Sequence, residues 1–344
     1  MMRAVVKVRP EPGALEIVDV PVPTPQQGEV RIRVKYASIC GTDVHIYSWD
    51  AWAASRIKTP LVIGHEFAGE VELLGPGVEG IEVGDFVSAE GHMACWSCHV
   101  CQEGNAHICP KGAILGVDRQ GCLAEYVVVP AKNVQPCDPS IPRHICSIQD
   151  PLGNAVHTAC AYDVKGKVVV VMGVGPIGAM AIAVLRRYGA KTIIAVERNN
   201  AMRAAMAKDM GADAVVDYES VSVDQFIQRF GYVDVVLEMS GSPAAVHSAI
   251  KVLSPGGKIA LLGLYHKPVT LDLTDDVVFK YVTIKGITGR LMFDTWDRMR
   301  RLFKDKTFAA DISRVVTHRM PFTDVVEAMD LMKKGECGKI VLEF

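Results

Sequence analysis

The stretch VVVVMGVGPIGAMAIAVL, Val168 to Leu185, contains eighteen residues without a charge and decides the fold of the second half of the chain. That length approaches a membrane span, but three glycines and a proline are clustered in its middle. The β-branched first part is typical of a strand buried in a parallel sheet. The part after Pro176 is rich in Ala, Ile, Met and Leu, as a helix with proline in its first turn would be. The stretch therefore predicts a strand, a tight turn and a helix, and no membrane segment.

The turn itself carries a nucleotide-binding pattern. GVGPIG fits G-x-G-x-x-G with Gly173, Gly175 and Gly178, and Glu197 ends the next predicted strand, nineteen residues after the last glycine. In this context the glycines let the backbone approach a pyrophosphate at the helix N-terminus, and the carboxylate accepts hydrogen bonds from a ribose. A carboxylate also repels a 2′-phosphate, which favours NAD over NADP, although Arg198 follows directly. The alternative is a tight strand–helix turn that binds no ligand.

The pattern of predicted strands and helices divides the chain into three parts. Residues 1–148 contain short alternating runs and turns, which predict a mostly β domain with a cysteine-rich lobe at 90–115. From about residue 165, strands and helices alternate, which predicts a doubly wound parallel sheet in an α/β fold. We place this second domain at 149–289. Residues 290–344 end in the strand GKIVLEF, which we expect to return to the first domain.

Composition excludes several classes of protein. Of 344 residues, 37 are Lys or Arg and 39 are Asp or Glu, and no basic run stands out. This balance argues against a nucleic-acid or membrane-surface partner. The N-terminal sequence MMRAVVKVRPEPG has no apolar stretch long enough for a signal peptide. We therefore expect a cytoplasmic protein that acts on a small molecule.

Four cysteines lie in the fifteen residues of CWSCHVCQEGNAHIC. Thiolates at the spacing C-x2-C-x2-C-x7-C can converge on one tetrahedral ion, and four-cysteine sites are closed, structural zinc sites. Disulfides are not expected without secretion. An iron–sulfur cluster is a competitor, because Pro110 follows the last cysteine, but the final gap of the ferredoxin run is shorter. A zinc ion with four sulfur ligands has no position left for a substrate, so the catalytic residues must lie elsewhere in the chain. The four residues are Cys95, Cys98, Cys101 and Cys109.

Two other segments supply residues for an open metal site, and the domain junction adds a carboxylate that would reach the metal either directly or through water. CGTDVHIY contributes Cys40, GHEFAGEV contributes His65 and Glu66, and QDPLGNAVHT contributes Asp150. Each residue alone has an ordinary structural explanation, such as a core thiol or a loop histidine. Together with a dinucleotide fold, they indicate a catalytic zinc with one position free.

These motifs, in this order, resemble the zinc-dependent medium-chain dehydrogenases over the entire chain. The order is Cys-Gly-x-Asp-x-His, Gly-His-Glu, the four cysteines and the glycine turn. The resemblance implies a GroES-like mostly β catalytic domain, a Rossmann NAD-binding domain, two zinc ions per subunit and a homotetramer. Segments such as GITGRLMFDTW and VVTHRMPF most resemble the branch that oxidises the 3-hydroxyl of L-threonine. A sorbitol-like polyol dehydrogenase shares the same zinc and NAD residues, and a dinucleotide-binding protein without activity is a further alternative.

The resemblance also implies roles for individual residues. Cys40, His65 and Glu66 would bind or flank the catalytic zinc, and the carboxylate of Asp150 fits the polyol and threonine branches. A relay from the Thr42 hydroxyl to His45, directly or through a cofactor ribose, would carry the substrate proton. His92 would line the substrate pocket or orient the cysteine lobe. The remaining positions that correspond to NAD contacts in relatives are Ile177, Glu197, Arg203, Leu262, Gly263, Leu264, Ile287 and Thr288.

Overall fold

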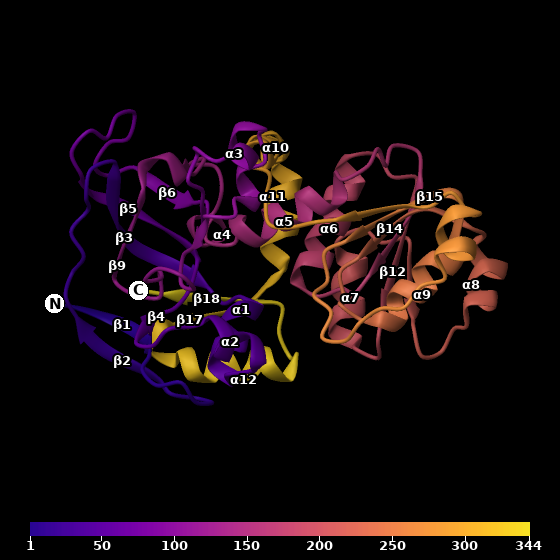
Figure 1. Cartoon of the computed structure of the whole chain (residues 1–344), viewed down its shortest axis with the longest axis horizontal. Coiled ribbons are helices and arrows are strands. Elements are labelled where there is room, and N and C mark those ends of the chain that lie inside the picture. The colour runs from indigo at the N-terminus through magenta and orange to yellow at the C-terminus, as the bar shows by residue number, and fades with distance from the viewer. The chain divides into compact units, whose positions relative to one another are not determined.

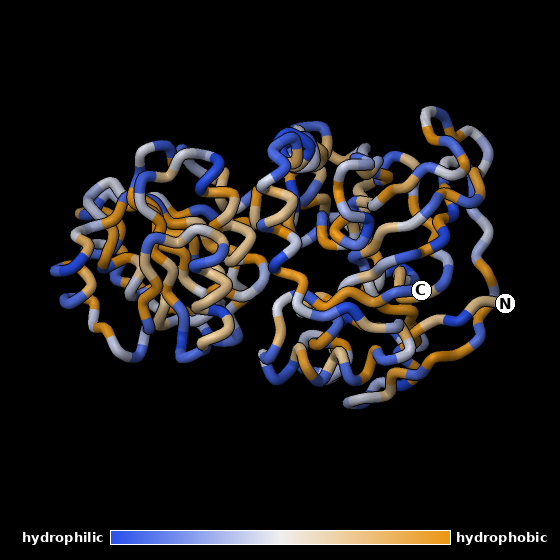
Figure 2. The backbone as a smooth tube through the Cα atoms, turned by 180° about the vertical axis from the view of Figure 1, so that it is seen from behind, coloured by the Kyte–Doolittle hydropathy of each residue, from blue (hydrophilic) through white to orange (hydrophobic).

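The computed structural model describes residues 1–344, and the chain folds as two compact units. The first comprises residues 1–151, 290–296 and 316–344, and the second comprises residues 152–289 and 297–315. In each unit the apolar residues lie along the inner strands and the helix faces that cover them (Figure 2). No helix is long and apolar enough to cross a membrane.

The first unit is built mainly from antiparallel strands. Its large sheet has the order β10-β6-β5-β3-β18-β17, and β9 also pairs with β3. A smaller sheet has the order β2-β1-β4, and β7 pairs with β8 in the cysteine lobe. The strands are β1 (Met2–Lys7), β2 (Leu15–Val20), β3 (Glu29–Ser38), β4 (Leu61–Val62), β5 (Glu66–Leu74), β6 (Phe86–Ala89), β7 (His92–Met93), β8 (Ala113–Ile114), β9 (Tyr126–Pro130), β10 (Val134–Pro136), β17 (Val316–Pro321) and β18 (Lys339–Glu343).

Short helices connect these strands. They are α1 (Gly41–Ser48), α2 (Ala51–Arg56), α3 (His99–Gln102), η1 (Ala106–Ile108), η2 (Ala131–Asn133), α4 (Arg143–Cys146), η4 (Phe322–Asp324) and α12 (Val325–Lys334). The predicted return of the C-terminal strand is confirmed: β18 pairs antiparallel with β3, Val341 opposite Ser38. Figure 1 shows this yellow strand among the indigo and purple strands.

The second unit is a parallel sheet covered by helices, as predicted. Its strand order is β13-β12-β11-β14-β15-β16, the doubly wound order in which the first strand lies beside the fourth. The strands are β11 (Val168–Met172), β12 (Thr192–Glu197), β13 (Ala214–Asp217), β14 (Val233–Glu238), β15 (Leu253–Leu261) and β16 (Thr283–Gly286). The helices are α6 (Pro176–Arg187), α7 (Ala201–Asp209), α8 (Val223–Phe230), α9 (Pro243–Val252), η3 (Leu273–Val278) and α11 (Lys306–Arg314). The remaining helices, α5 (Gln149–Ala159) and α10 (Asp294–Leu302), each contribute residues to both units.

The division of the chain differs from the expected boundaries at 297–315. We expected everything after residue 289 to lie with the first domain, but this segment packs in the second unit. Arg187 of α6 explains the difference, because its guanidinium pairs with Asp305 at 3.2 Å and with Asp311 at 2.6 Å. Arg187 also stacks on the Phe308 ring of α11, 5.5 Å from its centre. Contacts between residues more than 100 positions apart leave no local sequence pattern that would have indicated this place.

Candidate metal centres and nucleotide site

Three predicted metal ligands converge in the first unit. Cys40 precedes α1, His65 lies between β4 and β5, and Glu66 is the first residue of β5. One ligand atom from each lies within 4.8 Å of the other two. His65 is 8% exposed and Glu66 is 1% exposed. A thiol, an imidazole and a carboxylate this close together suit zinc, which takes sulfur, nitrogen and oxygen ligands.

The buried carboxylate of Glu66 is satisfied on one side only. Its Oε2 accepts hydrogen bonds from Ser38 Oγ and from the ammonium of Lys339, which also donates to Ile39 O at 2.6 Å. Its Oε1 is buried and has no hydrogen-bond partner. Because an unpaired buried charge is costly, this oxygen is suited to a bound cation.

Asp43 is a further buried carboxylate next to these ligands. Its Oδ2 accepts a hydrogen bond from the Cys40 amide at 2.9 Å, which fixes the start of α1. Its Oδ1 and the Nδ1 of His65 are both buried without hydrogen-bond partners. Burial raises the pKa of Asp43 above its usual value, because it outweighs the opposing effect of the nearby His65. Asp43 therefore acts on the imidazole through its charge, since no hydrogen bond joins the two side chains.

Asp150 lies beside this group rather than within it. Its Oδ1 accepts a hydrogen bond from Arg290 at 2.8 Å, and its buried Oδ2 has no hydrogen-bond partner. A Cβ atom on Gly91 would lie 3.1 Å from that Oδ2 and 3.5 Å from His65 Cβ, so the absent side chain keeps the space between them open. Burial raises the pKa of Asp150 above its usual value, because it outweighs the opposing effect of Arg290.

Arg290 is the centre of a buried polar network. Besides Asp150, its guanidinium donates to both oxygens of Glu90, with an Nε–Oε2 distance of 2.8 Å. Glu90 also accepts a bond from Trp296 Nε1 at 2.9 Å, and His92 Nδ1 lies 2.8 Å from Arg290. His92 therefore packs into this network. Arg290, Glu90 and Lys339 were missed by sequence reasoning; their only signal is a charge within a mostly apolar or short segment.

The site carries excess negative charge in the absence of a metal. Burial lowers the pKa of His65, but Cys40, Asp43 and Asp150 outweigh it and raise that pKa to about 10. The surrounding groups therefore favour a positive charge at this position, which a bound cation would supply. A metal would bind the neutral imidazole, since ligands bind metals in their deprotonated forms.

The predicted relay residues lie on α1. Thr42 and His45 are three positions apart, which brings their side chains to neighbouring positions on the helix. Thr42 Oγ1 lies 3.7 Å from Cys40 Sγ, next to the metal-ligand group. His45 Nδ1 lies 2.5 Å from Oδ2 of Asp50, a residue that sequence reasoning did not single out.

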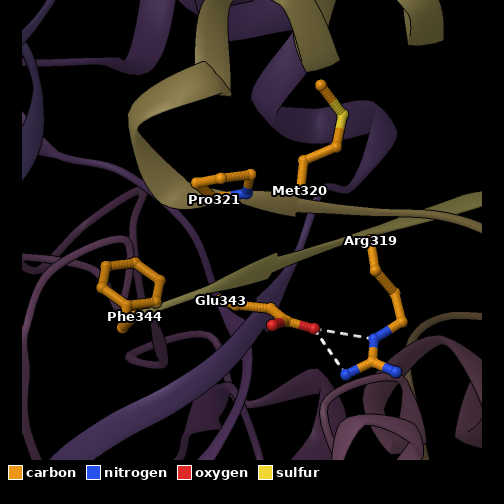
Figure 3. Close-up of a pocket in the computed structure, with 5 residues that line it drawn as sticks. All are labelled: Arg319, Met320, Pro321, Glu343 and Phe344. Carbon is orange, nitrogen blue, oxygen red and sulfur yellow. Dashed lines mark hydrogen bonds and ion pairs between the residues drawn. The ribbon is translucent and has the colours of Figure 1, made fainter.

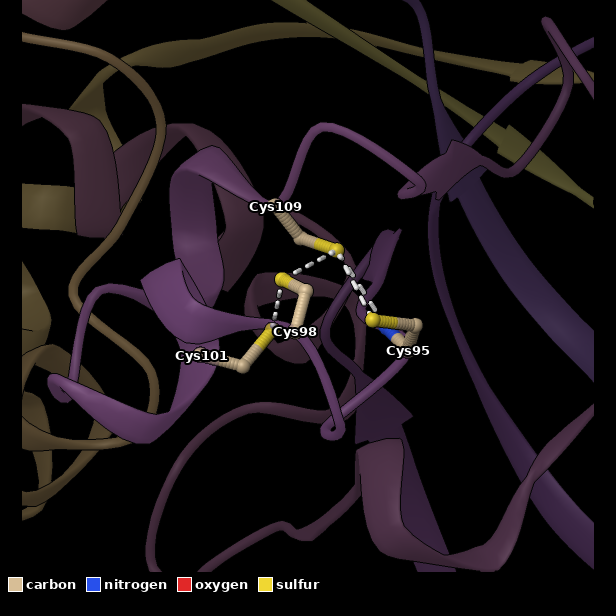
Figure 4. Close-up of side chains that lie close together, drawn as sticks. All are labelled: Cys95, Cys98, Cys101 and Cys109. Atoms are coloured by element: carbon tan, nitrogen blue, oxygen red, sulfur yellow. Dashed lines mark hydrogen bonds between the residues drawn. The ribbon is translucent and has the colours of Figure 1, made fainter.

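The four clustered cysteines form a second candidate metal site (Figure 4). All four sulfurs lie within 4.8 Å of one another, and neighbouring sulfurs are separated by 3.5 to 3.8 Å. A tetrahedral zinc with Zn–S bonds of about 2.3 Å requires sulfur separations of about 3.8 Å. The thiols are free and not joined in disulfides. The cage fits one ion, whereas a cluster of several iron and sulfide atoms would hold the thiolates further apart.

The glycine turn in the second unit has the geometry of a nucleotide site. Gly173 follows β11 with φ +89°, and a Cβ atom there would lie 2.8 Å from Ser240. A Cβ atom on Gly178 would lie 2.2 Å from the Gly173 carbonyl oxygen. At Gly175, by contrast, a Cβ would meet nothing within 4 Å, so the N-cap of α6 faces open space. This opening fits a pyrophosphate at the helix N-terminus.

The other predicted nucleotide residues follow the carboxyl ends of neighbouring strands. Glu197 ends β12; its Oε2 accepts a hydrogen bond from Val174 N at 2.6 Å, and its Oε1 lies 3.7 Å from Arg203. Arg198 is turned to Glu219, 2.6 Å away. After β15 and β16 come the remaining candidates, of which Leu264 is 80% exposed. They are Leu262, Gly263, Leu264, Ile287 and Thr288, and Ile177 lies in the first turn of α6.

A separate hollow of about 450 Å³ lies over the ends of β17 and β18 (Figure 3). It is lined by Arg319, Met320, Pro321, Glu343 and Phe344, and its polar feature is the Arg319–Glu343 ion pair at 2.6 Å. No metal-ligand or nucleotide candidate lines it, so it has no part in the chemistry described above.

Comparisons with known proteins agree with this geometry. Residues 26–139 match the alcohol dehydrogenase GroES-like domain, and residues 176–305 match the zinc-binding dehydrogenase family. The chain is 48% identical to the L-threonine 3-dehydrogenase of Caldanaerobacter subterraneus subsp. tengcongensis, with 99% of both chains covered. It is 44% identical to the L-threonine 3-dehydrogenase of Bacillus subtilis, with 99% of this chain and 98% of the relative covered.

Solved structures of related enzymes share the fold. Galactitol-1-phosphate dehydrogenase of Escherichia coli matches with a TM-score of 0.89 and 25% identity, and all of both chains is covered. An alcohol dehydrogenase of Escherichia coli CFT073, solved with NADH, matches with a TM-score of 0.87 and 28% identity over 100% of this chain and 99% of that one. The family models and the full-length identities establish that this chain belongs to the zinc-binding alcohol dehydrogenases.

Proposed function

We propose that the protein is an L-threonine 3-dehydrogenase that uses zinc and NAD. It oxidises the 3-hydroxyl of L-threonine, so that L-threonine and NAD⁺ give 2-amino-3-oxobutanoate, NADH and a proton. The observation that carries the proposal is the identity of 44 to 48% to curated threonine dehydrogenases over 99% of the chain. The convergence of Cys40, His65 and Glu66 supports it independently, because an alcohol oxidation needs a Lewis acid at the hydroxyl.

In this proposal Cys40, His65 and Glu66 hold the catalytic zinc, and Asp150 lies beside it. Bound zinc would lower the pKa of a coordinated hydroxyl group, as it lowers the pKa of coordinated water to about 7. The roles of the surrounding residues follow from their contacts. Lys339 holds one oxygen of Glu66, and Arg290 holds one oxygen of Asp150, so that in each carboxylate the other oxygen is available to the site.

The proton of the substrate hydroxyl must leave the site as the hydride departs. The Thr42 hydroxyl accepts it and passes it on to His45, directly or through a cofactor ribose, and histidine is the side chain best suited to exchange protons with water near neutral pH. His45 is suited to this exchange because 37% of its side chain is exposed. NAD supplies the hydride acceptor when it is bound by the second unit.

We propose that the glycine turn of residues 173–178 holds the pyrophosphate and that Glu197 holds the adenosine ribose. The neighbouring loops after β15 and β16 supply Leu262, Gly263, Leu264, Ile287 and Thr288 around the nicotinamide half. Ile177 packs at the start of α6, and Arg203 stays near Glu197.

A polyol dehydrogenase is the second candidate function. Dehydrogenases named for galactitol-1-phosphate and for 2R,3R-butanediol share the fold, but at 25% and 26% identity. The higher identity to threonine dehydrogenases favours threonine. We expect NADH formation with L-threonine to exceed that with sorbitol, 2,3-butanediol and simple alcohols by at least about tenfold in kcat/KM, which is a difference of about 1.4 kcal/mol in transition-state binding. Higher activity with a polyol would contradict the assignment.

We also propose a homotetramer in the cytoplasm. All ten cysteines are free, as thiols remain in a reducing compartment. In the second unit, β16 is an edge strand, and apolar side chains near it are exposed: Phe279 by 77% and Tyr281 by 83%. An exposed apolar edge is suited to pair with a second copy of the chain.

The oligomer proposal predicts that Phe279→Asp lowers the molar mass in light scattering, because a charge at a buried interface is costly. The matched control is Val83→Asp, which changes an equally apolar, 63% exposed residue in the first unit and should leave the assembly intact. If the parent is monomeric at micromolar concentration, or if both variants assemble like the parent, the edge is not the interface.

The two metal sites should respond differently to loss of one thiol. Cys95→Ser should lower the melting temperature by several degrees and release one zinc per subunit, because a structural zinc contributes directly to folding. Cys40→Ser should abolish turnover and leave the melting temperature within about a degree of the parent value. Mass spectrometry measures the zinc content of each variant, and calorimetry measures its melting temperature. The division of roles fails if Cys95→Ser melts like the parent with full zinc content.

The Glu197 carboxylate should set the preference for NAD. Glu197→Gln keeps an acceptor for Val174 N but removes the charge, so exclusion of NADP should relax while the turn stays intact. Glu197→Ser should in addition raise the KM for NAD by about 10- to 100-fold, since hydrogen bonds to a charged group are worth about 1.5–3 kcal/mol. Steady-state kinetics with both cofactors test this, and a parent enzyme that already uses NADP as well as NAD would contradict it.

A further inference from the structure

His45 is held by a carboxylate that lies five residues further along the chain. The Nδ1 of His45 lies 2.5 Å from Oδ2 of Asp50. The other oxygen of Asp50, Oδ1, accepts a hydrogen bond from the Ala53 amide at 2.9 Å, as the N-cap of α2. Because both oxygens have partners, the carboxylate cannot rotate away from the imidazole without losing the helix cap.

The backbone between the two residues is built for this contact. α1 ends at Ser48, and Trp49 has φ 52° and ψ 50°, the left-handed conformation that usually requires glycine. The amides of Trp49 and Asp50 both return to the carbonyl oxygen of His45. A left-handed non-glycine residue is strained, and such strain persists where surrounding contacts hold it.

The N-terminal strand supplies those contacts. The ammonium of Lys7 lies 5.2 Å from the centre of the Trp49 ring and donates a hydrogen bond to Tyr47 O at 3.3 Å. It also donates to the carbonyl oxygens of Glu11 and Gly13, both at 2.6 Å. The turn that presents Asp50 to His45 is therefore anchored from outside α1.

The contact decides which imidazole nitrogen carries the proton. A carboxylate only accepts hydrogen bonds, so a neutral imidazole beside it carries its proton on Nδ1 and leaves the lone pair on Nε2. The Trp52 ring, with its centre 6.1 Å from that of the imidazole, packs edge-on against the same ring. Burial raises the pKa of Asp50, but the hydrogen bonds from Ala53 and His45 outweigh it and lower that pKa below its usual value.

We propose that Asp50 is a positioning residue of the dehydrogenase reaction: it holds His45 as the Nδ1–H tautomer, with Nε2 as the proton acceptor. The carboxylate also stabilises the imidazolium that forms when Nε2 takes the proton from the Thr42 hydroxyl. The proton then passes from Nε2 to water, and the neutral imidazole is restored. This inference rests on the proposed relay and adds a residue to it. The simpler role for Asp50, capping α2, predicts different behaviour on substitution.

Asp50→Asn separates the two roles, because asparagine caps helices as well as aspartate does. Its amide group donates to Nδ1 and places the imidazole proton on Nε2, the wrong tautomer for accepting a proton. We expect kcat with threonine to fall by about 10- to 100-fold, less than for a fully buried pair because the Asp50 side chain is 33% exposed. The KM for NAD and the melting temperature should stay at their parent values.

The pH profile should change in a direction that a structural role would not produce. Because asparagine carries no charge to stabilise the imidazolium, the acidic limb of the kcat profile should move to lower pH while the plateau falls. Added imidazole, a mobile base, should restore part of the rate. The matched control is Asp272→Asn, which changes another N-cap aspartate, one that accepts the Thr274 amide at 2.9 Å in the second unit. It should leave kcat and its pH profile unchanged.

The tautomer can also be measured without turnover. Nitrogen NMR of ¹⁵N-histidine-labelled protein without substrate should show the His45 proton on Nδ1 in the parent and on Nε2 in Asp50→Asn. An Nε2–H tautomer in the parent, or an Asp50→Asn variant with the parent's kcat and tautomer, would overturn the inference. A failure of the proposed function would be seen separately, as a parent enzyme that is inactive with threonine while the tautomer result stands.

Discussion

The first unit is organised around buried negative charge. Four carboxylates there are at most 3% exposed: Asp43, Glu66, Glu90 and Asp150. Burying so many carboxylates is unfavourable unless cations and hydrogen bonds compensate them. Lys339 and Arg290 supply two positive charges, but Glu66 and Asp150 each keep one buried oxygen without a partner, beside Cys40 and His65. The remaining charge is what a divalent cation at the proposed catalytic site would neutralise.

This constraint explains why the chain returns to its first unit. Neither compensating cation comes from residues 1–151: Arg290 follows the last strand of the second unit, and Lys339 begins the final strand, β18. The pairing of β18 with β3 brings Lys339 to Glu66. There its ammonium and the hydroxyl of Ser38, at the end of β3, donate hydrogen bonds to the same carboxylate oxygen. The C-terminal segment thus completes the electrostatics of a site whose other residues all lie within residues 40–150, at least 140 positions earlier.

Site residues that lie in short local motifs could be predicted from the sequence, whereas site residues that are brought in by long-range contacts could not. The glycine turn and the four-cysteine loop are each contained in short stretches, so spacing alone indicates that their atoms converge. Cys40 and His65 are separated by two helices and a strand, and they were linked by motif order rather than by geometry. The single charges of Lys339 and Arg290 were not enough to identify them, because a charge in a short strand or loop normally lies in solvent. The placement of 297–315 depends on ion pairs to Arg187 that no periodicity encodes.

The central claim is that the unpartnered oxygens and the thiol of Cys40 surround a zinc ion. Anomalous X-ray diffraction from crystals of the purified protein, recorded at the zinc absorption edge, tests this most directly. The account predicts two peaks per chain: one about 2.3 Å from the sulfurs of all four clustered cysteines, and one about 2.0–2.3 Å from Cys40 Sγ and a His65 nitrogen. A single peak at the cysteine cluster, with Glu66 and Asp150 paired to other protein groups, would contradict it.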